Sequence, residues 1–104
     1  MTHGLELDCE VRGRTAEVAL NGDLDMAAAF KLEPAIESVV SENVIDALVL
    51  DLAGVSFIDS AGLGSLLSTH QRLHDVGINA TVRRPSEAVR RVLEVSGTRG
   101  VLLG

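Results

Sequence analysis

Apolar side chains occupy every second position in two stretches near the start of the chain, residues 5–11 and 16–20. The positions concerned are Leu5, Leu7, Cys9, Val11, Ala16, Val18 and Leu20. A period of two is typical of a strand that buries one face, and Gly13 supplies a turn residue between the two stretches. The pattern predicts an N-terminal β-hairpin in which Cys9 is a small core residue.

The apolar period then lengthens to that of a helix. After a loop at 21–25, the spacing predicts a helix that begins at Asp25, its expected N-cap, and ends at about Ser41. Pro34 lies inside this pattern. Because proline lacks a backbone donor and crowds the preceding turn, we expect a kink or a late restart there.

The rest of the chain alternates strands with helices. The run 46–52 is apolar on both alternations, which is typical of a central strand covered on both faces. The later elements are a helix from Ser60 to about Val76, a strand from Ile78 to Val82, a helix from Ser86 to about Ser96, and a short last strand from Val101 to Leu103. This order predicts one α/β domain over residues 1–104, with a mixed sheet of four to five strands packed by three to four helices.

The charge distribution, the length of the apolar runs and the cysteine count exclude several classes of function. Residues 1–59 carry 12 acidic against 3 basic side chains, and residues 60–104 carry 3 acidic against 6 basic, for a net charge of −6. This asymmetry argues against general nucleic-acid binding and permits a charged protein partner. The longest apolar run, Met26 to Phe30, is far shorter than the roughly 20 residues that cross a bilayer. We therefore expect a cytoplasmic protein without direct membrane insertion. Cys9 is the only cysteine, which excludes an internal disulfide.

The candidate chemistry lies where the strand 46–52 leads into the next helix. Asp59 and Ser60 open that helix, where a serine hydroxyl is suited to cap free backbone N–H groups. The same position favours an anion, including a phosphate attached to the serine. A hydrolase elbow would need glycine in place of Ile58, and no histidine is near enough to complete a triad. An enzyme is therefore the weakest interpretation.

Other polar residues allow further interpretations. Asp23, Asp25 and Asp59 are expected in loops at one end of the sheet, where two of them look like helix-start residues and a role in recognition is also allowed. Three carboxylates also suit a divalent ion, but capping is the commoner use of aspartate at helix starts. His70 and His74 are one helical turn apart without a third ligand, so they are expected at the edge of the core.

Nucleotide motifs are incomplete. Gly62-Leu63-Gly64 begins like a dinucleotide fingerprint, but Leu67 stands in place of the third glycine. The chain has no Gly-Lys-Ser or Gly-Lys-Thr run for a phosphate loop, so we expect no cofactor. Five arginines between residues 83 and 99 are expected on a solvated face or a docking surface, and they are Arg83, Arg84, Arg90, Arg91 and Arg99.

Three segments resemble a known family. They are Phe57-Ile58-Asp59-Ser60-Ala61-Gly62-Leu63-Gly64, Gly22-Asp23-Leu24-Asp25 and Ser96-Gly97. The first closely resembles the signature of the STAS domain in bacterial anti-sigma factor antagonists: an aromatic and aliphatic pair, Asp-Ser, a small residue, Gly and Leu. The others resemble the family's segments before its first helix and after its third. Ala61 is a departure, since several relatives have a second serine or threonine there.

The resemblance implies a non-enzymatic STAS fold that works by partner switching. When unphosphorylated, such a protein binds an anti-sigma factor and frees the sigma factor. The serine matching Ser60 is phosphorylated by the anti-sigma factor, a serine kinase, and restored by a PP2C-type phosphatase. The expected partner-binding residues are Asp23, Asp25, Asp59, Ser60, Ala61, Gly62, Leu63 and Gly64. The alternative is a soluble STAS subunit that regulates a membrane transporter complex.

Overall fold

Four strands form one mixed sheet in the spatial order β1-β2-β3-β4. β1 is antiparallel to β2, whereas β2, β3 and β4 are parallel. The structure, a computed structural model, describes residues 4–103. Its elements are β1 (Glu6–Arg12), β2 (Thr15–Leu24), α1 (Met26–Glu42), β3 (Ala47–Ile58), α2 (Ser60–Asp75), β4 (Asn79–Arg83), α3 (Glu87–Ser96) and α4 (Arg99–Leu102). The predicted hairpin and mixed α/β architecture are confirmed, and Gly13 takes a φ of 61° in the hairpin turn.

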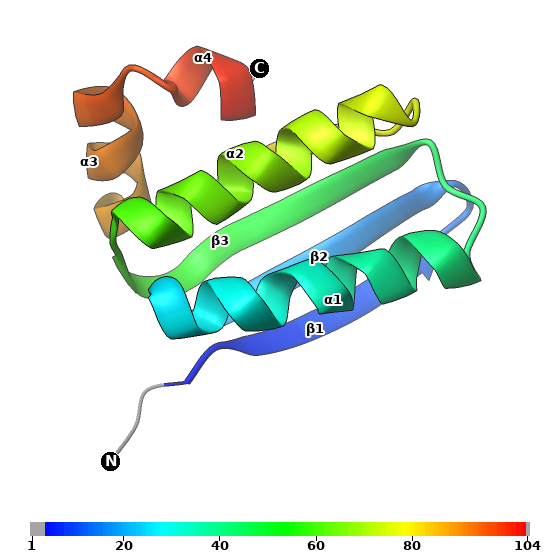
Figure 1. Cartoon of the computed structure of the whole chain (residues 1–104), viewed down its shortest axis with the longest axis horizontal. Helices are drawn as coiled ribbons and strands as arrows, with labels where there is room; N and C mark the ends of the chain where they lie inside the picture. Colours follow the sequence, from blue (N-terminus) through cyan, green and yellow to red (C-terminus); the bar gives the residue numbers. More distant parts are fainter. Residues whose placement is uncertain (1–3, 104) are drawn as a thin grey trace.

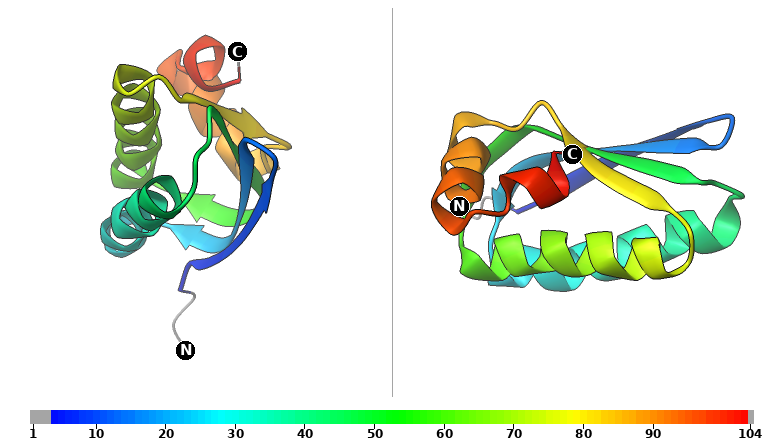
Figure 2. Two further views of the ribbon diagram at one scale, coloured as in Figure 1. Left: turned by 90° about the vertical axis from the view of Figure 1, so that its right-hand side faces the viewer. Right: turned by 90° about the horizontal axis from the view of Figure 1, so that it is seen from above.

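Helices α1 and α2 lie side by side on one face of the sheet (Figures 1 and 2). Each connects two parallel neighbours, α1 joining β2 to β3 and α2 joining β3 to β4. Helices α3 and α4 lie beyond α2, and α3 packs against β3. The first turns of α1 and α2 and the helix α3 lie at the same end of the molecule (Figure 1).

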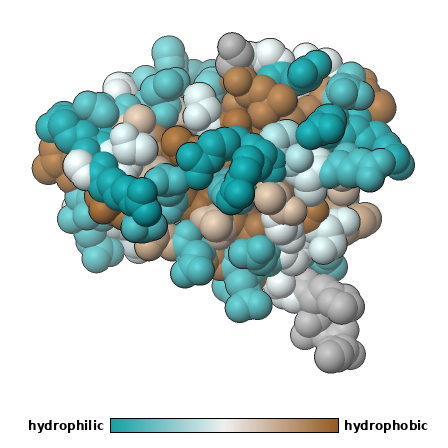
Figure 3. All heavy atoms as spheres, turned by 180° about the vertical axis from the view of Figure 1, so that it is seen from behind, coloured by the Kyte–Doolittle hydropathy of each residue, from teal (hydrophilic) through white to brown (hydrophobic). Residues whose placement is uncertain are grey.

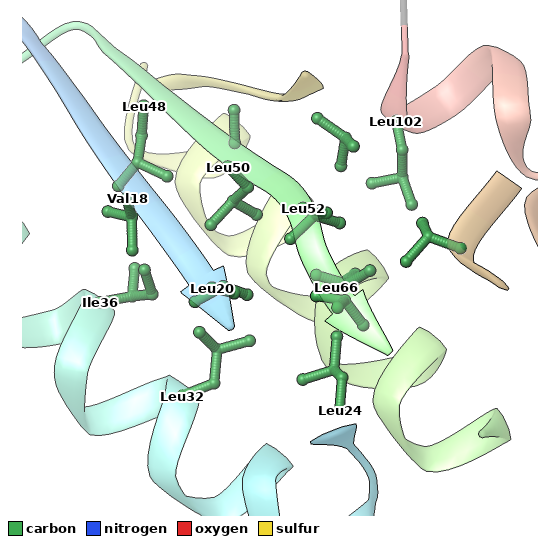
Figure 4. Packing of buried hydrophobic residues seen from close by; sticks show 14 of the residues in the cluster. Val18, Leu20, Leu24, Leu32, Ile36, Leu48, Leu50, Leu52, Leu66 and Leu102 are labelled. Carbon is green, nitrogen blue, oxygen red and sulfur yellow. The ribbon is translucent and has the colours of Figure 1, made fainter. Parts of the chain in front are cut away.

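The core is aliphatic, as a chain with only two aromatic residues requires. Leu32 and Ile36 of α1 face Val18 and Leu20 of β2, and these four side chains are at most 2% exposed (Figure 4). Leu66 belongs to the same buried cluster and brings α2 into it. Burial of these side chains holds the two helices in place on the sheet.

The opposite face of the sheet is not covered by helices, and hydrophilic side chains lie across it (Figure 3). The prediction that the central strand is covered on both faces is therefore wrong. In β3, Leu48 and Leu50 are buried beneath the helices, while Val49 on the other face is only half-buried. The apolar pattern of β3 reflects shielding by its neighbouring strands as well as by helices.

The prediction that Cys9 is a core residue is also wrong. Cys9 and Val11 are exposed, although they stand opposite the buried Val18 and Ala16 of β2. β1 is the edge strand, and α1 packs chiefly on β2, so the end of β1 near the hairpin turn has no cover. Within residues 4–12, only Leu5, which directly precedes β1, is fully buried, at 2% exposure.

β2 and β3 both extend further than the sequence pattern predicts. β2 continues through 21–24, where a loop was expected, and β3 runs to Ile58. The pairing is irregular at Asn21, whose side chain fills the space beside Gly54. A Cβ on Gly54 would lie 2.7 Å from Cγ of Asn21, so the Asn21 side chain takes this place only because residue 54 is glycine. The extension carries Leu24 beside Ile58.

The expected late restart at Pro34 and the expected last strand are both wrong. α1 continues through Pro34 without a restart; Phe30 and Pro34 are both exposed, so the carbonyl that loses its donor is on the solvent side. The last element is a helical turn, α4, in place of the predicted strand, and it buries Leu102 to 1% exposure. Among residues 4–103, no helix is both long enough and apolar enough to cross a bilayer.

Candidate functional site

Two helices begin side by side at the carboxyl ends of β2 and β3. Leu24 pairs with Ile58, and the next residue after each is an aspartate, Asp25 or Asp59. Each carboxylate accepts a hydrogen bond from the backbone N–H three residues further on, at 3.0 Å for Asp25 and 2.8 Å for Asp59. Both aspartates are N-caps, as predicted for Asp25, and the strand pairing brings the two caps together.

Ser60 is the first residue of α2, and it is exposed. The prediction that its hydroxyl caps the helix is wrong, because Asp59 occupies the cap position. The carboxylate of Asp59 binds the N–H of Gly62, and its carbonyl accepts from Leu63 at 2.9 Å. Within the described residues the N–H groups of Ser60 and Ala61 have no protein acceptor. The Ser60 hydroxyl is therefore available for chemistry without loss of the cap.

Gly62 holds the first turn of α2 against the end of β2. It is buried, and a Cβ there would lie 3.1 Å from Cγ of Leu24 and much closer to the Leu24 carbonyl oxygen. That oxygen also accepts the N–H of Asp59 at 3.4 Å. Gly64 differs, because it is exposed and nothing lies within 4 Å of its Cβ position. Only the first of the two motif glycines is required by packing.

The third predicted carboxylate, Asp23, lies in β2 and not in a loop. It pairs with Phe57 one position before the Leu24–Ile58 pair and is half-buried, as are Asp25 and Asp59. The three carboxylates thus gather at the end of the sheet where α1 and α2 begin. In the part of the chain that the structure describes, no group of three His, Cys, Asp or Glu residues is placed to hold a metal ion.

An apolar groove adjoins Ser60 on the side of α3. Its volume is about 400 Å³. We call it the α2–α3 groove, and its lining residues are Ile58, Asp59, Ser60, Leu63, Arg91, Val92, Val95 and Ser96. Val95 is 85% exposed at its rim. The predicted site residues Ser60 and Leu63 therefore lie beside side chains of α3 that are distant in the sequence.

The sequence pattern did not predict the α3 side of this groove. Val89 and Leu93 form the buried stripe of α3, and Val95 lies off that stripe. An apolar residue outside the buried stripe of an amphipathic helix was the available signal. Its position beside Ser60 depends on how α3 packs, which the helical pattern alone does not determine.

Further exposed apolar side chains stand at the same end of the molecule. Met26 and Phe30 of α1 are 61% and 75% exposed, and Phe57 of β3 is 49% exposed. Met26 and Phe30 follow the N-cap Asp25 in sequence, and Phe57 precedes the N-cap Asp59. Exposed apolar groups beside a polar, modifiable residue are typical of a surface that binds another protein.

The five arginines between residues 83 and 99 do not form one patch. Arg83 and Arg84 line a hollow of about 470 Å³ on the uncovered face of the sheet, together with acidic side chains of β1 and β2. Arg83 pairs with Glu17 at 2.6 Å. Arg90 and Arg91 lie on α3, and Arg99 is the first residue of α4. Of these arginines, only Arg91 lines the groove beside Ser60.

Asp51 is an ionisable residue buried in the middle of β3, 7% exposed. Arg84 donates two hydrogen bonds to it, that from Nε at 3.1 Å, and Ala53 N donates a third at 3.1 Å. The Arg84 hydrogen bond is the main cause that lowers the pKa of the Asp51 carboxyl below its ordinary 3.8. Arg84 has a φ of 50° and follows β4 directly, so the ion pair joins the turn after β4 to the middle of β3. The contact is structural and lies on the face away from Ser60.

The two histidines of α2 differ in environment. Nδ1 of His70 lies 2.9 Å from the carbonyl oxygen of Ala80, which ties α2 to β4. His74 is exposed one turn later. The prediction of an edge-of-core position is confirmed for His70, and His74 lies outside the core.

Comparison with known proteins identifies the fold and the relatives. The family model described as the STAS domain matches residues 6–102. The anti-sigma F factor antagonist of Lysinibacillus sphaericus is 29% identical over 87 residues, which cover 84% of this chain and 74% of that protein. An anti-sigma factor antagonist from Mycobacterium paratuberculosis has a crystal structure with a TM-score of 0.78 and 31% identity, covering 95% of this chain and 83% of that one.

The anti-sigma factor antagonist SpoIIAA is similar in two states. Its unphosphorylated form matches with a TM-score of 0.78 and 25% identity over 94% of this chain and 86% of that one. Its phosphorylated form, from Bacillus, matches with a TM-score of 0.72 and 24% identity over 94% of this chain and 89% of that one. The same backbone arrangement is thus present in both forms of that protein.

Proposed function

This chain belongs to the STAS domain family, and we propose that it is an anti-sigma factor antagonist whose partner binding is switched by phosphorylation of Ser60. The observation that supports this best is the position of Ser60. It is exposed as the first residue of α2, directly after the aspartate that caps the helix. The named relatives favour this function over that of a transporter subunit, since they are anti-sigma factor antagonists.

In the unmodified state, the surface around Ser60 binds the anti-sigma factor and releases its sigma factor. The side chains available for contact are the carboxylates of Asp23, Asp25 and Asp59 and the exposed apolar groups beside them. A regulatory, non-enzymatic role agrees with the named relatives, which are all antagonists of anti-sigma factors.

The modification step uses the exposed hydroxyl of Ser60. The partner, a serine kinase, transfers the γ-phosphoryl group of ATP, so that an Oγ–P bond forms, the bond between the phosphoryl group and ADP breaks, and the hydroxyl proton is released. A PP2C-type phosphatase hydrolyses the phosphate ester and restores the serine. Neither step requires the helix to open, because the cap is made by Asp59.

The fold tolerates the phosphate at this position. A phosphate on Ser60 adds about −1.5 to −2 charge at neutral pH. The free N–H groups of Ser60 and Ala61 lie at the positive end of the α2 dipole, where negative charge is stabilising. The switch therefore acts on binding and leaves the stability of the domain nearly unchanged.

The same phosphate is unfavourable for the partner. It adds charge to a surface that already holds Asp59, Asp25 and Asp23, so an acidic region of the partner is repelled. Stabilisation and repulsion act at different places. The N-terminus of α2 stabilises the phosphate within the domain, while the phosphate and the neighbouring carboxylates together present a more negative surface to the partner.

The test is phosphorylation in vitro. The full chain is incubated with ATP and each candidate anti-sigma serine kinase from the same genome, and intact mass is measured. We expect one phosphoryl group on the wild type, none on Ser60→Ala, and one on the control Ser68→Ala, which changes another exposed serine of α2. Absence of any Ser60-dependent mass change across the whole kinase set would overturn the proposal.

A further inference from the structure

We propose that a second copy of this chain binds to the uncovered face of the sheet, so that two chains form a symmetric dimer. In this dimer Asp8 of each copy contacts Arg83 of the other. The face lies opposite α1 and α2 and carries hydrophilic side chains (Figure 3). Because it lies away from Ser60, the dimer is a property of this protein beyond the proposed function.

The uncovered face is unusual for strands that run parallel. β2, β3 and β4 are parallel, and α1 and α2 cover only their other face (Figure 2). Sheets of parallel strands are as a rule covered on both faces. Ala19, Ala47 and Val49 place apolar side chains on the uncovered face, and each is only half-buried. The middle of this face therefore offers apolar area that a second sheet can remove from water.

One row of paired residues carries charges of opposite sign at its two ends. Asp8 of β1 pairs with Ala19 of β2, which pairs with Asp51 of β3. Asp51 pairs in turn with Arg83 of β4. All four residues line the hollow of about 470 Å³ on this face. Because Asp51 is buried and bound by Arg84, the row presents a negative end at β1 and a positive end at β4.

Both ends of this row are able to bind a further group. Asp8 is exposed and has no ion pair among the residues that the structure describes. Arg83 is exposed and binds Glu17 through one terminal nitrogen at 2.6 Å. Since a guanidinium has five N–H donors, Arg83 can donate to a second carboxylate and keep Glu17. The two ends of the row are thus complementary between copies.

The charge pattern selects one two-fold axis for the dimer. If the axis runs parallel to the strands between β2 and β3, β1 of each copy lies over β4 of the other, and Asp8 faces Arg83. In the next row Glu10 then lies over Thr81 of the other copy. An axis across the strands would stack β1 on β1 and bring the acidic side chains of the two copies together, which is unfavourable. Stacked sheets lie about 10 Å apart, a distance that an aspartate and an arginine span together.

The dimer leaves the candidate phosphorylation site accessible. Ser60 begins α2, which lies on the other face of the sheet. Because the axis is parallel to the strands, the two copies of Ser60 lie at the same end of the dimer. One dimer therefore presents two exposed sites, and the dimer and the proposed function are tested separately.

The first test is the oligomeric state of the full chain. Sedimentation equilibrium is measured over about a hundredfold range of chain concentration, because the fraction of dimer rises with concentration. We expect an average mass that increases from that of one chain toward that of two. A single-chain mass over the whole range overturns the dimer and leaves the proposed function intact.

The second test exchanges the two charges between copies. Asp8→Arg alone places two positive groups at each contact, and Arg83→Asp alone places two negative groups there. We expect each variant to dimerise at least about tenfold more weakly than the wild type. In an equal mixture, one copy is positive and the other negative at both positions, so both contacts are restored and a heterodimer forms. Wild-type dimerisation of either single variant overturns the assigned contact, as does a mixture that associates no better than its components.

Asp75→Arg and Arg90→Asp are the matched controls. They make the same changes of net charge at exposed positions on α2 and α3, away from the uncovered face. Each should dimerise like the wild type, alone and mixed. Weakening by the controls equal to that by the test variants overturns the assigned contact, since net charge would then be the cause. Circular dichroism checks every fold, and if Arg83→Asp does not fold, Asp8→Arg on the exposed edge strand decides the contact.

Discussion

The carbonyl oxygen of Leu24 lies against Gly62, in the space that a side chain at position 62 would occupy. The contact joins the last residue of β2 to the first turn of α2, two segments that the chain separates by a helix and a strand. Because Ser60 and Asp59 belong to that same turn, the Leu24–Gly62 contact determines how the candidate phosphorylation site is presented.

Gly62→Ala is expected to destabilise the domain, because a Cβ at this position clashes with a backbone oxygen that is fixed by the strand. We expect a loss of about 1–3 kcal/mol in the free energy of unfolding, measured by urea denaturation. Gly64→Ala is the matched control in the same helix turn, since its Cβ meets nothing within 4 Å. There we expect no loss, or a small gain from better helix propensity. Equal stability of Gly62→Ala and the wild type would contradict the close contact.

Asp59→Ala is expected to cost about 1 kcal/mol of stability, because it removes the side-chain cap of α2. Asp59→Asn keeps the acceptor oxygen and removes the charge, so it should unfold close to the wild type. Thermal unfolding of the three proteins separates the two roles of the carboxylate. If Asp59→Asn is as unstable as Asp59→Ala, charge and not hydrogen bonding is the main contribution of this cap.

Ser60→Asp is expected to weaken binding to the anti-sigma factor and to leave the circular dichroism spectrum and the thermal midpoint nearly unchanged. The reason is that the added charge lies at the N-terminus of α2, where it is tolerated by the helix and exposed to the partner. Ser60→Ala should bind like the unmodified protein and resist inactivation by kinase and ATP. Binding of Ser60→Asp at wild-type affinity would show that charge at this position is not the switch.

Acid stability should depend on Asp51. Its pKa is lowered in the folded state, chiefly by the hydrogen bond from Arg84, so the ionised carboxylate stabilises the fold above the unfolded pKa of about 3.8. That stabilisation is lost as the pH falls from 3.8 through the lower folded-state pKa.

Asp51→Asn retains an acceptor for Ala53 N and removes the charge. Its thermal midpoint should lie below that of the wild type at pH 6, and the difference should shrink as the pH is lowered beneath 3.8. Asp46→Asn is the control, because both side chains of the Asp46–Arg14 pair are exposed and the pair contributes little to the free energy of unfolding. A pH-independent difference for Asp51→Asn would exclude the ion pair as its cause.

The sequence by itself determined most of the architecture of this protein and the residue that carries the proposed switch. Alternation in β1 and β2, helical spacing after Asp25 and the caps at Asp25 and Ser86 are local properties, and each predicted its element correctly. The order Asp59-Ser60 before a helical stripe also marked the candidate site, because capping and anion binding at a helix start depend on neighbours in the chain.

Only the tertiary structure decided which elements cover one another. Burial of β1 depends on how far α1 reaches across the sheet, so Cys9 alternates with core residues and is nevertheless exposed. The length of β2 depends on pairing with β3, and the place of the Asn21 side chain depends on the space beside Gly54; no local pattern contains either. The groove beside Ser60 arises because α3 packs against β3 and brings Val92 and Val95 to Leu63. Such contacts are set by the packing of residues distant in sequence, and periodicity reports only on residues near each other in the chain.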